Sequence, residues 1–313
     1  MGNDPSFRAA AIDLGSNSFR LLIVGKNGAG LRPLCNRLIT VALGQGLMPG
    51  CNLSSHSMDR ALTALRTFRQ DLDRHAPQRL RACGTEALRR AANSMDFLAE
   101  AERILGRRIE ILTGEEEARL TYEAVVSDLD LPVPFLIADV GGGSTELITV
   151  RDRPPTLDCR SFPFGALSLT DRFAGVENGD EEMQRCMRRH VRESLAHQDM
   201  ACGISLVGSG GTITALAALL QGLACYDRTR IHGCRIALTQ LNQTFDQLSR
   251  MPVAERCKLF GLEDGRGRII IAGLAIFQVI AELCRAETLL VSDAGLLEGI
   301  LLSALRSNGT LAG

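Results

Sequence analysis

The residues best suited to chemistry lie around three consecutive glycines flanked by acidic side chains. Residues 137–150 read IADVGGGSTELITV, so that Asp139 precedes the glycines and Glu146 follows them. A hairpin turn needs only one or two glycines, and the additional glycine leaves more backbone without side chains than a turn requires. Such backbone lets N–H groups approach an anion closely, and Ser144 and Thr145 add hydroxyl donors. The stretch therefore predicts a phosphate-binding loop.

The same pattern occurs earlier in the chain, where residues 11–24 read AIDLGSNSFRLLIV. When Asp13 is aligned with Asp139, Gly15 falls on Gly141 without a gap. A third glycine-rich turn, GSGGT, follows an apolar run at residues 208–212. One such turn is weak evidence for phosphate binding, but three in one chain are stronger evidence. The predicted phosphate contacts in the loops are Ser16, Asn17, Ser18, Gly141, Gly142, Gly143, Ser144, Thr145, Gly208, Ser209, Gly210, Gly211 and Thr212.

Carboxylates beside the loops are candidate metal ligands, because phosphate groups usually bind together with Mg²⁺. Asp13 and Asp139 each end a strand-like run just before a loop, where they could hold a hydrated Mg²⁺. Glu146 is a further candidate ligand. Alternatively, each aspartate caps its own turn, but the repetition of the pattern favours the metal. The sequence contains neither GxxxxGK[ST] nor GxGxxG, which argues against a Walker P-loop and a dinucleotide fold.

The segments between the loops alternate between strand-like and helical patterns, which predicts an α/β fold. The Pro-containing stretch SDLDLPVP suggests a boundary near residues 126–134, and hence domains 1–128 and 129–313. Predicted helices cover residues 61–75, 85–106, 115–129 and 180–198, predicted strands cover 79–84 and 108–114, and strand–turn–helix units cover 204–223 and 288–305.

The composition argues against several classes of partner. The net charge of −1 gives no bulk attraction to nucleic acid or to a membrane. The ten cysteines show no CxxC pair and no His at metal spacing, which is typical of reduced, individually buried thiols. The first residues, MGNDPSFRAA, form no signal segment, and no uncharged apolar run reaches membrane-spanning length. We predict a cytosolic protein with neither a nucleic-acid partner nor a membrane partner.

Six stretches together resemble the exopolyphosphatase and guanosine pentaphosphatase family. They are AAIDLGSNSFRLLIV, GTEALRRAANSMDFL, TGEEEARLTYEAV, ADVGGGSTEL, GSGGTITAL and VSDAGLLEGIL, in order from residue 9 to about residue 302. The resemblance implies two ribonuclease-H-like domains, as in actin, Hsp70 and sugar kinases, with a cleft between them. It also implies Mg²⁺-dependent removal of the terminal phosphate of inorganic polyphosphate, a short two-domain form and a homodimer.

One motif departs from this family pattern. Many members have an Arg-x-Asp before a late apolar helix, as in RADIIxAG. Here the stretch reads GRGRIIIAG, so that Arg266 is kept and Arg268 stands in the place of the aspartate. A role carried by an acidic residue at that place is therefore not expected in this chain.

The acidic run GEEEARL contains three glutamates that the residues alone do not distinguish, since all three could complement a helix dipole. The resemblance assigns the catalytic role to Glu117, which would orient the attacking water. Arg20 and Arg89 are candidate phosphate clamps. Four arginines of the predicted helix 180–198 could line a polyanion track or form a solvated face, namely Arg185, Arg188, Arg189 and Arg192.

We expect an exopolyphosphatase, with three alternatives. A guanosine pentaphosphate (pppGpp) 5′-phosphohydrolase would use the same loops and Glu117. A non-hydrolytic sensor of polyphosphate or nucleotide would have less need of Glu117 as a water-activating base. A sugar or acid kinase would need an adenine pocket, which is not evident in the sequence.

Overall fold

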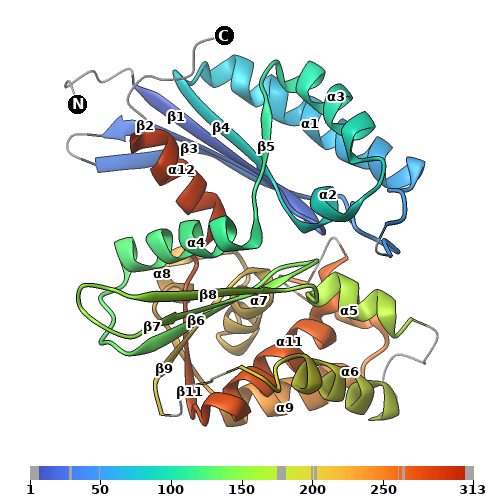
Figure 1. Ribbon diagram of the computed structural model, residues 1–313, viewed down its shortest axis with the longest axis vertical. Coiled ribbons are helices and arrows are strands. Elements are labelled where there is room, and N and C mark those ends of the chain that lie inside the picture. The colour runs from blue at the N-terminus through green and yellow to red at the C-terminus, as the bar shows by residue number, and fades with distance from the viewer. Residues whose placement is uncertain are drawn as a thin grey trace. The chain divides into compact units, whose positions relative to one another are not determined.

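The computed structural model describes residues 7–27, 30–48, 50–174, 181–198, 200, 203–259, 261–262 and 265–306. The chain divides into two compact units (Figure 1). Unit 1 comprises residues 1–124 and 296–313, and unit 2 comprises residues 125–295. Each unit has one mixed sheet with helices packed against it, which confirms the predicted α/β class.

Unit 1 contains a five-stranded sheet in the order β3-β2-β1-β4-β5. The first three strands form an antiparallel meander, and β4 and β5 continue the sheet parallel to β1. Their bounds are β1 Arg8–Leu14, β2 Ser18–Asn27, β3 Gly30–Thr40, β4 Arg79–Gly84 and β5 Ile109–Ile111. Because side chains alternate along a strand, β1 supplies apolar groups to both faces of the sheet.

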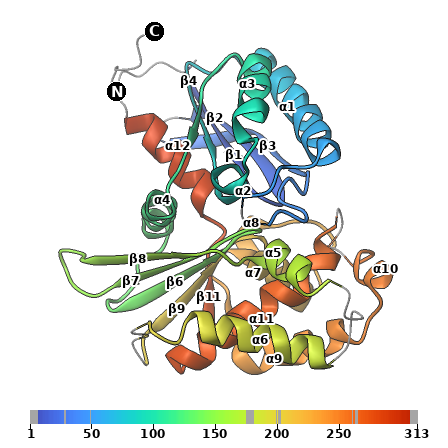
Figure 2. The ribbon, with the colours of Figure 1, turned by 45° about the vertical axis from the view of Figure 1, so that its right-hand side comes forward.

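The two faces of this sheet are covered by different helices (Figure 2). Helices α1 (Ser55–His75) and α3 (Ser94–Leu105) pack with Ile12 and Leu14 on one face. On the other face, α12 (Leu296–Arg306) and α4 (Gly114–Asp128) bury Leu297, Ile300 and Leu120 with Ala9 and Ala11. Residues 296–306 therefore belong with unit 1, whereas the sequence-based division had placed everything after residue 128 in the second domain. The physical reason is that β1 has apolar side chains on both faces of the sheet, and α12 buries those on one of these faces.

The predicted helix 85–106 is interrupted in the structure. It forms α2 (Glu86–Arg90) and α3, with the intervening Ala91 in an extended conformation at φ −72° and ψ 132°. The side chain of Asn93 accepts from the N–H of Leu53 at 2.8 Å and donates to its carbonyl at 3.2 Å. These hydrogen bonds join the break in the helix to a segment forty residues earlier in the chain. The spacing of apolar residues along the helix does not predict such a contact.

Unit 2 contains a six-stranded sheet in the order β10-β11-β9-β6-β7-β8. Strands β6, β7 and β8 form an antiparallel meander, β9 and β11 run parallel to β6, and β10 is antiparallel to β11. Their bounds are β6 Phe135–Val140, β7 Thr145–Val150, β8 Leu157–Phe162, β9 Ser205–Ser209, β10 Arg235–Ala237 and β11 Thr288–Val291. Both units therefore begin with the same meander followed by parallel strands, the ribonuclease-H-like arrangement that the resemblance implied.

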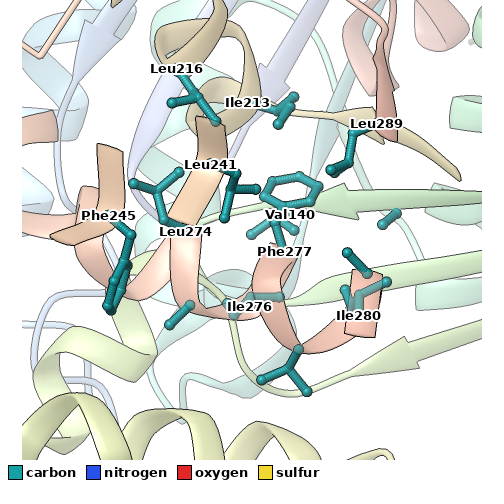
Figure 3. Close-up of a cluster of buried hydrophobic side chains, with 14 of the residues drawn as sticks. Val140, Ile213, Leu216, Leu241, Phe245, Leu274, Ile276, Phe277, Ile280 and Leu289 are labelled. Atoms are coloured by element: carbon teal, nitrogen blue, oxygen red, sulfur yellow. The ribbon is translucent and has the colours of Figure 1, made fainter. Parts of the chain in front are cut away.

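The core of unit 2 is built around α11 (Arg266–Cys284), whose Leu274, Phe277 and Ile280 pack against β6 and its neighbours (Figure 3). The other helices of unit 2 are α5 Ala166–Arg172, α6 Glu181–Ser194, α7 Gly211–Leu220, α8 Arg228–Ile231, α9 Leu238–Ser249 and α10 Val253–Arg256. Among the described helices, α11 alone is long and apolar enough to cross a membrane, with a mean hydropathy of 1.8, but 83% of that window is buried inside the protein.

The described cysteines are all free thiols, but they are not all buried as the sequence suggested. Cys83 and Cys284 are buried, whereas Cys51 and Cys225 are exposed. Burial raises the pKa of the Cys83 thiol to about 12, so this thiol stays protonated and unreactive at neutral pH.

Candidate functional site

The two repeated glycine-rich loops are the turns of equivalent hairpins, one in each unit. The N–H of Gly15 donates to the carbonyl of Ser18 at 3.2 Å, and the N–H of Gly141 donates to the carbonyl of Ser144 at 3.0 Å. The first turn joins β1 to β2 and the second joins β6 to β7. The repeat predicted from the sequence is thus confirmed in the backbone.

The carbonyl groups of the first loop are held by the segment 41–44. The carbonyl of Ser16 accepts from the N–H of Gly44 at 2.8 Å, and that of Asn17 accepts from Val41 and Ala42 at 3.0 and 2.7 Å. Within the described ranges, the N–H groups of Ser16 and Asn17 donate to no other residue. The loop carbonyls are therefore used for folding, and the phosphate contacts predicted for Ser16 and Asn17 stay predictions.

The carbonyl groups of the second loop are held by α5. The N–H of Ala166 donates to Gly141 at 2.9 Å, and that of Leu167 donates to Gly142 at 2.8 Å. A Cβ at Gly165 would lie 2.6 Å from the carbonyl oxygen of Gly141, so only glycine permits this approach. In the part of the chain that the structure describes, the N–H groups of Gly142 and Gly143 likewise donate to no protein acceptor.

The third glycine-rich loop lies beside the acidic end of β6. Gly210 adopts φ 100° and ψ 170°, a conformation essentially restricted to glycine. A Cβ there would lie 2.6 Å from the carbonyl oxygen of Val140 and 3.2 Å from Oδ1 of Asp139. Ser209 is the β9 partner of Asp139 in the parallel ladder. Unit 2 therefore brings together two of the three predicted loops and Asp139.

Several residues of this third loop serve packing. Gly208 fits between Ile213 and Phe277, with a hypothetical Cβ 3.0 and 3.1 Å from their side chains. Thr212 is 6% exposed and fits against Gly273 of α11. The predicted phosphate contacts of Gly208 and Thr212 remain predictions, and the structure adds a packing role for each.

Arg266 is a neighbour of this loop that the sequence-based set of site residues omitted. Its guanidinium lies over Gly211, with Nη2 3.4 Å from the position a Cβ would take there. The signal available in the sequence was the arginine kept from the family motif before the late apolar helix. Its proximity to a loop more than fifty residues earlier in the chain required the fold.

Asp139 and Glu146 lie directly opposite each other in the β6–β7 ladder, so their side chains share one face. Glu146 is 3% exposed, and its Oε1 accepts from the hydroxyl of Ser161 at 2.7 Å. Two carboxylates beside an anion loop are the hard oxygen donors that Mg²⁺ prefers, and Mg²⁺ is commonly bound by one or two carboxylates with water and phosphate. No group of three or more His, Cys, Asp or Glu side chains suited to a metal occurs among the described residues. The donor set therefore fits Mg²⁺ bound together with a phosphate.

The corresponding pair in unit 1 differs in charge. Asp13 lies opposite Arg20 in the β1–β2 ladder, so that an arginine stands where unit 2 has Glu146. Nη2 of Arg20 also lies 3.6 Å from Oε1 of Glu298 on α12. The first hairpin thus has a fixed cation beside its aspartate.

The structure distinguishes the three glutamates at the start of α4. Glu115 and Glu116 are exposed, whereas Glu117 is 5% exposed. Glu116 forms a reciprocal cap with Thr113, at 2.8 Å from the N–H of Thr113 to the carboxylate and 3.2 Å in return. The hydrogen bond from the Thr113 backbone lowers the pKa of Glu116. Glu117 is therefore the member of the run with tertiary contacts.

Arg89 holds Glu117 in unit 1. Its Nη1 donates to Oε1 of Glu117 and to the carbonyl of Leu112, the latter at 2.6 Å, and its Nη2 donates to Oε2 of Glu86 at 2.7 Å. Burial lowers the pKa of Arg89, but the charges and hydrogen bonds of Glu117 and Glu86 outweigh burial and leave it raised. The guanidinium predicted as a phosphate clamp is here engaged by two carboxylates. Glu86, which the sequence analysis did not single out, lies one turn before Arg89.

The arginines of α6 contact neighbouring side chains of unit 2. Arg188 and Arg192 each donate to the carboxylate of Glu282 on α11 at 2.5 Å. Arg185 pairs with Glu182 of its own helix at 2.7 Å. These contacts favour helix packing and a solvated face over a polyanion track.

The fold and these residues define a class of protein, namely a two-unit α/β protein with a glycine-rich hairpin loop in each unit. The sequence model of the Ppx/GppA phosphatase family matches residues 22–308. The chain therefore belongs to the Ppx/GppA phosphatase family, whose members hydrolyse phosphoanhydride bonds, and the resemblance seen in the sequence is confirmed.

Similar proteins include both curated and solved relatives. A guanosine-5′-triphosphate,3′-diphosphate pyrophosphatase of Aeromonas hydrophila is 32% identical over 312 residues, which is 98% of this chain and 61% of that protein. The chain thus spans 61% of the length of that curated relative. The crystal structure of the Aquifex aeolicus family member has a TM-score of 0.80 and 32% identity, and the match covers 97% of this chain and 99% of that chain. An exopolyphosphatase structure from Cytophaga hutchinsonii has a TM-score of 0.87 and 26% identity, covering 95% and 97%.

Proposed function

We propose that this protein is an exopolyphosphatase, which hydrolyses the terminal phosphoanhydride of inorganic polyphosphate and releases orthophosphate. The observation that carries the proposal is the pair of equivalent loops, whose carbonyl groups are bound and whose N–H groups at residues 16–17 and 142–143 donate to no described residue. Such a cradle suits a ligand that is phosphate along its whole length, since backbone N–H groups recognise oxyanions without needing a base or sugar. Family membership supports the hydrolytic class of reaction.

Unit 2 would hold the metal in this proposal. Asp139 and Glu146 would bind Mg²⁺, which neutralises the charge on phosphate oxygens in phosphoryl transfer. The loops 141–145 and 208–212 would orient the phosphates beside these carboxylates. Arg266, whose guanidinium lies over Gly211, adds a forked donor suited to phosphate.

Unit 1 would supply the base. Glu117 would orient the attacking water and accept its proton. Arg89 fixes the direction of the Glu117 carboxylate by donating to its Oε1, and Glu86 in turn holds Arg89. Arg89 therefore acts through Glu117 in this scheme, in addition to any contact with phosphate.

A second candidate substrate is pppGpp, because the Aeromonas relative is a guanosine-5′-triphosphate,3′-diphosphate pyrophosphatase. Removal of the 5′-terminal phosphate of pppGpp breaks the same kind of bond. The loops, Glu117 and the Mg²⁺ ligands would keep their roles, and the difference would lie in contacts with guanosine.

The deciding experiment measures orthophosphate release from polyphosphate and from pppGpp with Mg²⁺. The proteins are the wild type, Glu117→Gln and, as a control, Glu115→Gln, which removes the same charge from an exposed position two residues away. We expect Glu117→Gln to lose about a hundredfold or more in kcat, the scale of a positioned base. The control should stay within about twofold, as is usual for exposed substitutions.

Each outcome has a definite meaning. Release from pppGpp at a rate equal to or above that from polyphosphate would assign the nucleotide as substrate. Absence of release from both by the wild type would contradict hydrolysis and favour a non-hydrolytic phosphate-binding regulator.

The predicted cytosolic location and homodimer come from the sequence and the family resemblance, and both stay predictions. Cell fractionation tests the first, and light scattering of the purified protein tests the second.

A further inference from the structure

The first turn of α11 contacts the elements that carry both glycine-rich loops of unit 2. Arg266 lies over Gly211 of the third loop. Two residues later, Nη2 of Arg268 lies 2.6 Å from Oδ1 of Asp171 on α5. Residues two apart on a helix point about 200° apart, so the two arginines face different neighbours. The turn thus lies between the third loop and α5.

Helix α5 connects this turn to the second loop. Its first N–H groups, from Ala166 and Leu167, donate to the carbonyls of Gly141 and Gly142. The side chains of the same two residues form a small buried cluster with Ile269 of α11. A seven-residue helix is not stable alone. Leu169 of α5 also joins the main core of unit 2, which includes α11. The apolar contacts hold α5 on α11, and the Arg268–Asp171 pair adds a polar contact at the first turn of α11.

Both charges of this pair lie at the unfavourable ends of their helices. Asp171 is the penultimate residue of α5, where the helix dipole disfavours a carboxylate, and Arg268 is in the first turn of α11, where the dipole disfavours a cation. The side chain of Asp171 is 15% exposed and that of Arg268 is 36% exposed, so that replacing Arg268 leaves the carboxylate of Asp171 half-buried without this partner. The stability of the individual helices therefore does not explain why these positions are charged. The contact between the two side chains does explain it.

We propose that Arg268 and Asp171 form a positioning pair that sets the spacing between loop 141–145 and loop 208–212. The proposal rests on the proposed function, because this spacing matters if both loops bind neighbouring phosphates of one ligand. Neither residue needs to touch the substrate.

The first test measures kcat and KM for polyphosphate in four variants. They are Arg268→Ala, Asp171→Ala, the charge-swapped Asp171→Arg/Arg268→Asp and the control Arg185→Ala, which breaks an exposed pair with Glu182. We expect each single change of the pair to raise KM between about ten- and a hundredfold, the scale of a small misplacement of binding groups. The swapped variant should regain most of the affinity, because it restores the pair and puts each charge at the favourable end of its helix.

Thermal unfolding of the same variants separates positioning from stability. A lowered Tm with an unchanged KM in the single variants would overturn the proposal, because the pair would then be structural only. A raised KM that the swap does not restore would overturn it as well.

A binding measurement distinguishes failure of this inference from failure of the proposed function. Calorimetry with tripolyphosphate and Mg²⁺ in the Glu117→Gln background needs no turnover. Weaker binding after Arg268→Ala, restored by the swap, supports the positioning pair even if the wild type hydrolyses nothing. Equal affinity with and without Arg268 overturns it.

Discussion

Arg20 and Glu146 occupy equivalent places in two hairpins that otherwise match. Each lies across the ladder from an aspartate, Asp13 in β1 and Asp139 in β6. A divalent cation beside Asp13 would lie opposite the guanidinium of Arg20 in the ladder, and like charges on opposite cross-strand positions repel. We therefore infer that Mg²⁺ binds at the second hairpin and that Arg20 supplies the positive charge at the first. The metal role predicted for Asp13 stays a prediction, and this arrangement disfavours it.

Metal affinity should separate the two hairpins. We expect Glu146→Gln to weaken Mn²⁺ binding by about tenfold or more, measured by electron paramagnetic resonance with Mn²⁺ in place of Mg²⁺. Asp13→Asn should change the affinity by less than about threefold, since the first hairpin already carries a cation. Equal losses in the two variants would show that both aspartate sites bind metal.

The glycine-rich loops and the side-chain pairs of the candidate site differ in how far they could be predicted from the sequence. The loops could be predicted because a hairpin and its glycines are encoded within fourteen residues of chain. The contact between Arg89 and Glu117 joins residues 28 apart in the chain, and that of Arg268 with Asp171 joins residues 97 apart. No local pattern encodes such pairs, so the residue types locate the acidic run, and only the family resemblance singled out Glu117 within it.

Equivalent loops are supported by different elements in the two units. The carbonyls of the first loop accept hydrogen bonds from the irregular segment 41–44, and those of the second loop accept them from the N-terminus of α5. In both units, N–H groups of the supporting segment donate to the loop carbonyls. The two supports therefore have the same effect, which is to fix the orientation of the peptide groups of the loop. Neither support was predicted, because segment 41–44 has no periodicity and α5 is only seven residues long.

The third loop should be sensitive to an added methyl group at Gly210. Gly210→Ala combines a forbidden backbone conformation with a contact to the carbonyl of Val140, and we expect it to destabilise unit 2 by about 2 kcal/mol or more. Gly222→Ala is the matched control, because Gly222 has φ +59° with nothing within 4 Å of an added Cβ. Its cost should be about 1 kcal/mol. Urea unfolding measures both, and equal costs would contradict the role assigned to the close approach.

The edge strand β3 illustrates why some elements could not be predicted. Most of its side chains are exposed or half-buried, so the alternation of buried and exposed residues that marks a strand is missing. It pairs with β2 throughout its length, with a bulge at Ile23 and Val24. Its existence therefore depends on the neighbouring strand more than on its own residues.

At the scale of the whole molecule, unit 2 is inserted into unit 1. Residues 125–295 are continuous, whereas unit 1 needs both the beginning and the end of the described chain. Arg79 joins these ends, because its guanidinium lies 5.6 Å from the ring centroid of Phe7 and donates to the carbonyls of Ala304 and Leu305. A division based on sequence patterns places each domain boundary at one point along the chain. It therefore does not predict that the last helix belongs to the first unit.

Truncation after Gly295 should therefore unfold unit 1. The deletion removes Leu297, Ile300, Leu301 and Leu305 from the apolar face of the β1 sheet. At about 1.5–3 kcal/mol for each buried side chain, the loss is comparable to the total stability of a domain. Calorimetry should show the transition of unit 2 retained and that of unit 1 absent. Truncation after Arg306 is the control, and a cooperative transition of unit 1 in the shorter chain would refute the assignment.

The return of α12 also determines the order in which the protein can fold on the ribosome. Domains generally fold as they emerge, the N-terminal one first. Here residues 7–124 emerge with one face of their sheet lacking α12, half of its cover, while unit 2 has its complete sequence before α12 is synthesised. The nascent chain must therefore complete its second unit first, and the first unit can close only when the last helix has left the exit tunnel.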